Sequence, residues 1–386
     1  MSDNVFNVQR VAHNLEVLAE LKSASPNPDV LKRYTGWGGL RNAVYTSNVY
    51  RVLKQHCSES EIASIKKTIS NAYYTPSALI ECVFDGLLRL SRPFQTILEP
   101  SVGHGLFFEH MPDEWRRGAL YAVEMDEVSC QLFQQLYPDV SLHQGGFETC
   151  QPPIAFDLIL GNPPYGQAVV ADASHPDISR LRIHHFFVAK CMRLLAPGGI
   201  LAMVLPRYFL DNRQDHARGI IHQEGGSLLA AYRLPDNLFA DAKVTVDLVF
   251  LVKEKGEEDW LYVDKIKIDN RVSHINRYFS INPSHIIGEL AMVEAYGRYE
   301  LACRQPSKGD PFALLKQLLT YFPPKKLPTL DECKIKLNKR LELVDKDIQS
   351  LSLMKNRLLQ AQRDLQRMER QFLQRCVDTV NVQSLS

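Results

Sequence analysis

Residues 71–255 predict an α/β fold in which a mostly parallel sheet is covered by helices on both faces. Five short apolar runs bounded by turn residues are typical of strands: 96–98, 119–123, 158–160, 200–205 and 246–252. Helical patterns lie between them, for example at 128–136 and 185–195, and Ala-Pro-Gly-Gly at 196–199 predicts a turn. Strands that alternate with helices form parallel βαβ units, whose ligands bind at the carboxyl ends of the strands.

The composition is that of a soluble globular protein. Of 386 residues, 45% are hydrophobic and 23% are charged. The longest apolar stretches, 200–205 and 248–252, are far shorter than the roughly 18 residues of a membrane span, and the first ten residues contain no apolar core of a signal peptide. Eight scattered cysteines form no CxxC pair. We therefore expect no membrane contact, no bound metal and a cytoplasmic protein with reduced thiols.

A proline corner carries the sharpest chemical signal. The strand at 158–160 leads directly into Asn162-Pro163-Pro164-Tyr165. Two consecutive prolines lack N–H groups and fix φ, so the backbone carbonyls there are free and their direction is set. Asn162 adds a side-chain carbonyl and Tyr165 a flat aromatic face. These groups predict a pocket that accepts two hydrogen bonds from an exocyclic amino group and stacks on its ring; a plain proline-rich turn is the alternative.

A glycine loop and two acids point to a nucleotide site. Glu99 ends the first predicted strand, and the loop after it carries Gly103 and Gly105. Glycines let the backbone approach a ligand closely at the first strand-to-helix turn. Glu124 ends the next strand, where nucleotide-binding sheets hold a ribose diol. A helix-capping role for Glu124 is the alternative.

These motifs, in this order, resemble those of adenine-specific, S-adenosylmethionine-dependent DNA methyltransferases. The segment 71–76 resembles the motif that holds the methionine end of the cofactor, 99–107 the glycine loop, and 162–165 the catalytic tetrapeptide. The match covers roughly residues 30–255, and the clusters at 34–40 and 275–279 resemble parts of large phage- and plasmid-borne members. The resemblance implies a Rossmann-like methyltransferase fold and S-adenosyl-L-methionine as cofactor.

The resemblance also implies roles for single residues. Thr75 and Glu99 would hold the methionine carboxylate and amine, and Glu124 the ribose hydroxyls. The cofactor-binding residues implied in full are Tyr74, Thr75, Pro76, Glu99, Pro100, Gly103, Gly105, Glu124 and Phe147.

One position departs from the family pattern. The family usually has an acid and then a phenylalanine near the third strand to hold the adenine ring of the cofactor. Here Phe147 fits the stacking role, but Gly146 stands where the acid is expected. A backbone carbonyl, Glu148 or water would then have to bind the adenine amino group.

The implied reaction is a direct in-line transfer of a methyl group to the N6 amine of adenine. The target base must be flipped out of the duplex or be single-stranded already. Asn162 and the Pro163 carbonyl would accept the two amine hydrogens, Pro164 would hold the corner rigid, and Tyr165 would stack on the base. Alignment and preplaced polar groups would supply the catalysis.

The DNA surface is less clear from the sequence. The net charge is only +1, so a phosphate-binding surface must be local. Arg207 and Lys243 are the candidate DNA contacts, because both follow predicted elements on the side of the catalytic motif.

Other readings share parts of this pattern. Asn-Pro-Pro-Tyr also occurs in enzymes that methylate a release-factor glutamine amide and in some RNA methyltransferases, and N4-cytosine methylation is chemically close. A catalytically inert DNA-binding subunit with a methyltransferase fold is a further alternative, favoured by the departure at Gly146.

The flanking segments predict three additional parts. Residues 1–70 are expected to be mostly helical, and 256–330 to form a small appended module for DNA contact or target recognition, with a linker at 323–328. Residues 331–386 are predicted to be a helical or coiled-coil region, because apolar residues from Leu337 to Phe372 follow heptad spacing. We expect the helix at 331–378 to join subunits in a homo- or hetero-oligomer; a helical hairpin or a DNA contact is the alternative.

Overall fold

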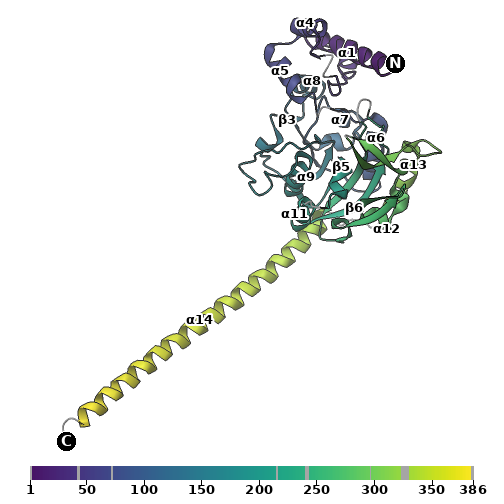
Figure 1. The fold of residues 1–386 in the computed structure, drawn as a ribbon. Coiled ribbons are helices and arrows are strands. Elements are labelled where there is room, and N and C mark those ends of the chain that lie inside the picture. Colours follow the sequence, from purple (N-terminus) through teal and green to yellow (C-terminus); the bar gives the residue numbers. More distant parts are fainter. Residues whose placement is uncertain are drawn as a thin grey trace. The chain divides into compact units, whose positions relative to one another are not determined.

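A computed structural model describes residues 2–40, 44–70, 73–213, 216–239, 243–295, 297–322 and 330–383 (Figure 1). The chain divides into two compact units, Met1–Leu330 and Asp331–Ser386, and each is described by itself. The predicted boundaries at 70 and 255 lie inside the first unit and stay predictions. The predicted linker at 323–328 and the first two residues of the 71–76 motif lie outside the described residues.

A seven-stranded sheet forms the centre of the first unit, with the strand order β3-β2-β1-β4-β5-β7-β6. The strands are β1 (Thr96–Glu99), β2 (Ala119–Glu124), β3 (Ser141–Gln144), β4 (Phe156–Gly161), β5 (Leu195–Pro206), β6 (Gly226–Leu234) and β7 (Val246–Lys253). The first five run parallel, and β7 is antiparallel to both of its neighbours. The predicted Rossmann-like, mostly parallel sheet is therefore confirmed.

Helices cover both faces of this sheet (Figure 1). Neighbouring strand residues alternate between two apolar clusters: Ile97 and Leu158 face one, whereas Leu98 and Ile159 face the other. The first cluster contains α6 (Ser77–Leu88), α7 (Leu106–His110) and α13 (Pro311–Leu319), and the second contains α9 (Ile183–Leu194) and α11 (Ala217–Gln223). Burial of both faces explains why the central strands are continuous apolar runs.

The amino-terminal helices pack against one end of the sheet domain. They are α1 (Ser2–Leu21), α2 (Pro28–Leu31), α4 (Ser47–His56) and α5 (Glu59–Thr68), and they share an apolar cluster with Val128 and Leu132 of α8 (Glu127–Leu136). Buried Glu61 of α5 reinforces this contact, because it accepts hydrogen bonds from Lys22 at 2.6 Å and Gln131 at 2.7 Å. The helical prediction for 1–70 holds over the described residues.

The turn predicted at 196–199 is only partly correct. Helix α9 does end at Leu194, but β5 already begins at Leu195. The pairing with β4 shifts between Phe156↔Leu195 and Leu158↔Ile200, so the glycines form an irregular stretch inside the strand.

Two hairpins and short helices follow the sheet. The hairpins pair β8 (Val263–Ile268) with β9 (Arg271–Asn276) and β10 (Glu289–Ala295) with β11 (Arg298–Arg304). The remaining short helices are α10 (Tyr208–Asp211), α12 (Arg277–Ile281), η1 (Trp115–Arg117), η2 (Phe147–Thr149), η3 (Asp259–Leu261) and η4 (Pro283–His285).

The second unit is one long helix, α14 (Leu330–Gln383). Seam residues of the predicted heptad are more than half exposed on it, among them Leu341, Ile348 and Leu351. The coiled-coil pairing stays a prediction. Across the described residues, no helix combines the length and apolarity that crossing a membrane requires.

Candidate active site

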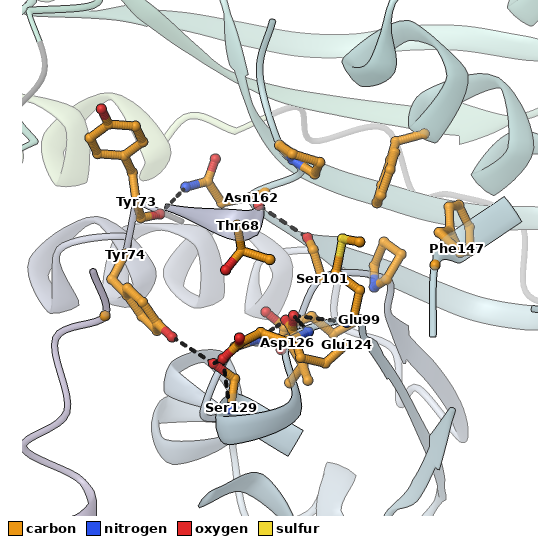
Figure 2. Close-up of a pocket in the computed structure, with 18 of the residues that line it drawn as sticks. Thr68, Tyr73, Tyr74, Glu99, Ser101, Glu124, Asp126, Ser129, Phe147 and Asn162 are labelled. Carbon is orange, nitrogen blue, oxygen red and sulfur yellow. Dashed lines mark hydrogen bonds between the residues drawn. The ribbon is translucent and has the colours of Figure 1, made fainter. Parts of the chain in front are cut away.

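A cavity of about 360 Å³ opens at the carboxyl ends of β1, β2 and β4 (Figure 2). The strand order reverses between β1 and β4, so the connections from these strands leave in opposite directions and a crevice remains between them. Nine of the predicted site residues line this cavity: Tyr74, Thr75, Glu99, Pro100, Gly103, Glu124, Phe147, Asn162 and Pro164. Motifs nearly 90 residues apart in the sequence thus meet in one pocket.

Four of the predicted catalytic and cofactor-binding residues do not line the cavity. Pro76 precedes the first residue of α6, and Gly105 precedes the first residue of α7 with φ +100°. Pro163 is buried, and Tyr165 is half-buried beside Asn162.

Glu124 is held by the backbone at the end of β2. Oε2 accepts a hydrogen bond from Gly103 N at 2.8 Å, and Oε1 accepts from Met125 N and Asp126 N, each at 2.8 Å. Burial raises the pKa of Glu124 to about 7, although these backbone donors oppose the rise. Asp126, rather than Glu124, caps helix α8, because its carboxylate accepts a hydrogen bond from Ser129 N at the start of that helix.

Glu99 is a buried acid that faces the cavity without a donor. It is 2% exposed, and its Oε2 has no hydrogen-bond partner among the described residues. Burial, with a smaller contribution from the nearby Glu124 carboxylate, holds the pKa of Glu99 well above its ordinary value. A buried acceptor in this state is costly unless a ligand supplies a donor.

Tyr74 forms one wall of the cavity because two glycines make room for its ring. A Cβ on Gly36 would overlap the Tyr74 ring, and a Cβ on Gly103 would lie 2.8 Å from it. Both glycines have positive φ, +66° and +58°, which other residues rarely adopt. The Tyr74 hydroxyl lies 3.4 Å from Ser129 Oγ (Figure 2).

The proline corner presents Asn162 to the cavity. Nδ2 of Asn162 donates to Tyr73 O at 3.2 Å, and Ser101 Oγ donates to the Asn162 backbone oxygen at 3.1 Å. The Tyr165 hydroxyl lies 2.6 Å from Asn162 Oδ1 and 2.8 Å from Val204 O, and its single proton serves one acceptor at a time. The Asn162 amide is therefore oriented, while the Tyr165 ring is not part of the lining.

Phe147 lies on the opposite side of the cavity from Tyr73 and Tyr74 (Figure 2). It packs on Phe187 with ring centroids 4.9 Å apart. Fully buried Lys190 donates to Phe147 O at 2.8 Å and Glu148 O at 3.1 Å, and it forms an ion pair with Asp172 at 2.8 Å. The turn that carries Phe147 is thus fixed from behind by a buried ion pair.

Several lining residues were missed by the sequence analysis. Tyr34, Trp37, Lys67 and Thr68 come from the amino-terminal segment. The aromatic and glycine-rich cluster at 34–40 was the available signal for two of them. Glu148, which the sequence offered as a partner for the adenine amino group, also lines the cavity. The lining further contains Tyr73, Ser101, Val102, Met125, Asp126, Ser129, Gly145, Val170, Ile183 and Phe187.

The two candidate DNA contacts differ in the structure. Arg207 already has carboxylate partners, with Asp211 at 3.7 Å and Glu300 at 3.5 Å, and its side chain is 12% exposed. A phosphate would have to compete with these carboxylates for the guanidinium, and a DNA contact by Arg207 stays a prediction. Lys243 is exposed, and its contact with DNA stays a prediction.

Comparison with known proteins shows which family the central part of the chain resembles. Residues 122–224 match the Eco57I restriction-modification methylase family. This part of the chain is thus similar to restriction-modification methylases. The matched residues run from the end of β2 to α11 and include Glu124, Phe147 and the proline corner.

Half of the chain is similar to viral proteins. It is 27% identical over 192 residues to defense against restriction protein B of Escherichia phage P1. That alignment covers 48% of this chain and 8% of the phage protein. It is 26% identical over 194 residues to type II methyltransferase M.CvrRI of Paramecium bursaria Chlorella virus XZ-6E, covering 49% of this chain and 50% of that protein. The chain therefore spans half or less of these relatives.

A solved structure completes the comparison. The methyltransferase subunit of a type I restriction-modification system from Streptococcus thermophilus aligns with a TM-score of 0.40 and 16% identity, over 70% of this chain and 72% of that one.

The match to this methylase family implies S-adenosylmethionine as cofactor, and the residues present fit it. The orphaned Glu99 oxygen suits an ammonium group, the Glu124 carboxylate suits a ribose diol, and the ring of Phe147 suits a purine. Within the described part of the chain, no group of three or more His, Cys, Asp or Glu side chains could hold a metal ion.

Proposed function

We propose that the chain transfers a methyl group from S-adenosylmethionine to the N6 amine of adenine in DNA. The observation that carries the proposal is the position of Asn162, whose oriented amide lines the same cavity as Glu99, Glu124 and Phe147. The restriction-modification methylase match and the viral relatives support DNA as the substrate.

The cofactor supplies a methyl group activated by a positive sulfonium. Glu99 would accept from the methionine ammonium, Glu124 from the ribose hydroxyls, and buried Thr75 would donate to the carboxylate. Lys67 lies in the same lining and adds a positive charge for that carboxylate.

Asn162 would orient the attacking amine. Oδ1 keeps a second lone pair beside the bond from Tyr165, and the Pro163 carbonyl supplies another acceptor. Two accepted hydrogen bonds favour a pyramidal N6 with its lone pair directed at the methyl carbon. A nitrogen–carbon bond then forms as the carbon–sulfur bond breaks, and one amine proton leaves to solvent; no covalent enzyme intermediate is needed.

Tyr165 has two separable tasks in this proposal. Its hydroxyl fixes Asn162, and its ring would stack on the flipped base once the base enters. Because Phe keeps the ring and loses the hydroxyl bond, Tyr165→Phe separates the tasks. We expect Tyr165→Phe to slow the reaction about tenfold, and Tyr165→Ala or Asn162→Ala to slow it at least a thousandfold.

The deciding experiment incubates the full chain with methyl-labelled cofactor and either duplex or single-stranded DNA, followed by nucleoside mass spectrometry. N6-methyladenine is the expected product, and N4-methylcytosine as the sole product would contradict the proposal. An inert DNA-binding subunit would yield no product and no heat with S-adenosylmethionine. Near-parental turnover in Asn162→Ala with an intact fold would place the catalytic site elsewhere.

A further inference from the structure

The turn after β3 carries an acid in an unexpected place. Gly146 has no side chain, but Glu148 lines the same cavity two residues later. A Cβ built on Gly146 would overlap both carboxylate oxygens of Glu148 and lie 2.5 Å from its Cδ. The Glu148 carboxylate therefore occupies the space into which a side chain at 146 would extend.

The backbone that presents this carboxylate is rigidly held. Residues 147–149 form the short helix η2, and Thr149 Oγ1 donates to Gly146 O at 2.8 Å. The buried Lys190 ammonium binds the carbonyls of both Phe147 and Glu148. A side chain on such a turn starts from a fixed Cα, so its reach into the cavity is restricted.

The Glu148 carboxylate is available to a ligand. Within the described residues, no hydrogen bond or ion pair engages its oxygens. An ionised carboxylate only accepts hydrogen bonds, so its partner must carry an N–H or O–H donor. A purine on the adjacent Phe147 ring would place such donors within reach when it bears an exocyclic amine.

We propose that Glu148, rather than a side chain at position 146, accepts a hydrogen bond from the 6-amino group of the cofactor's adenine ring and thereby sets selectivity for that ring. The inference rests on the proposed function, because it requires S-adenosylmethionine in this cavity. Glycine at 146 and glutamate at 148 form one unit, since the glycine leaves the space that the carboxylate fills.

Calorimetry with two ligands tests this assignment without relying on turnover. The probes are S-adenosyl-L-homocysteine and its analogue with hydrogen in place of the 6-amino group. We expect the full chain to bind the first at least tenfold more tightly, because a hydrogen bond to a charged group is lost with the analogue. Glu148→Ala should bind both ligands within about twofold of each other, whereas the exposed control Glu257→Ala should discriminate as the parent does.

A second variant guards against loss of fold. In Gly146→Asp/Glu148→Ala the acid returns to position 146, and we expect at least half of the tenfold discrimination to return. Persistent tenfold discrimination in a folded Glu148→Ala variant would overturn the assignment while leaving the proposed function intact. Absence of binding of either ligand to the parent chain would overturn the proposed function and this inference together.

Discussion

At the scale of single residues, the cavity holds two carboxyl groups that burial favours in the protonated form. Glu99 and Glu124 come from adjacent strands. Burial raises the pKa of both, and the Glu124 carboxylate adds a smaller rise at Glu99. A bound ammonium and ribose hydroxyls favour the ionised carboxylates instead. Protonation and cofactor binding are therefore coupled at this site.

We predict that cofactor binding releases protons and strengthens as pH rises from 6 to 8. The pKa of Glu124 is raised to about 7, so the empty site still holds part of this proton at neutral pH, and binding favours its loss. Titrations with S-adenosyl-L-homocysteine in buffers of low and high ionisation enthalpy should differ in heat. Glu124→Gln should bind more weakly and with a smaller pH dependence; an identical pH dependence in that variant would contradict the assignment.

We predict that Gly36→Ala destabilises the first unit by about 2 kcal/mol or more. The new Cβ would overlap the Tyr74 ring, and alanine is strained at φ +66°. Urea unfolding measures the loss. Gly297→Ala is the matched control, because Gly297 has a similar φ of +74° but nothing lies within 4 Å of its added Cβ. Equal stability of the two variants would show that Tyr74 can leave its place without cost.

At the scale of elements, one buried ion pair joins three parts of the site. Lys190 comes from α9, Asp172 from the loop after the proline corner, and the carbonyls that Lys190 binds belong to η2. Both side chains are fully buried, and His175 Nδ1 lies 3.0 Å from the same Asp172 carboxylate. The loop after the proline corner and the turn of Phe147 are thus held by the same ion pair.

We predict that Lys190→Met lowers the free energy of unfolding by about 3 kcal/mol, because it leaves a buried carboxylate without its main partner. The loop around Asp172 should also become more sensitive to protease. Lys265→Met serves as the control, since Lys265 is exposed on β8. If Lys190→Met were as stable as the parent, the attraction within the ion pair would only balance the cost of removing its two charges from water.

At the scale of the whole molecule, α14 exposes a long apolar seam. Leu351 is 66% exposed and Leu358 is 68% exposed, which is unusual for leucines at heptad spacing on one helix. Such a seam gains stability when a second helix covers it. The predicted oligomer therefore depends on α14 and not on the first unit.

We predict that the full chain self-associates and that Leu351→Glu/Leu358→Glu shifts it to monomer in light scattering. Unfolding of the first unit should be unaffected. Leu353→Glu is the control, because Leu353 is 59% exposed but lies off the seam. Self-association that survives the double substitution would contradict the predicted seam.

Much of the sheet could be predicted because its strands are buried on both faces and read as apolar runs. β3 was missed because it is an edge strand with no fully buried residue, and β6 because it contains Arg233. Arg233 is fully buried between Asp211 and Asp247, and no local pattern shows that two carboxylates from elsewhere neutralise it. Single-sequence patterns detect burial of apolar residues better than burial of paired charges.

The sequence by itself determined five of the seven strands, the proline corner and the acids at the ends of β1 and β2, because local periodicity and strand-end positions fix these features. Only the tertiary structure decided that Tyr34, Trp37 and Lys67 reach the same cavity, that Arg207 is engaged by acids, and that Glu148 fills the space beside Gly146. The physical reason is that such contacts join segments whose approach depends on packing of whole helices, which no short stretch of residues encodes.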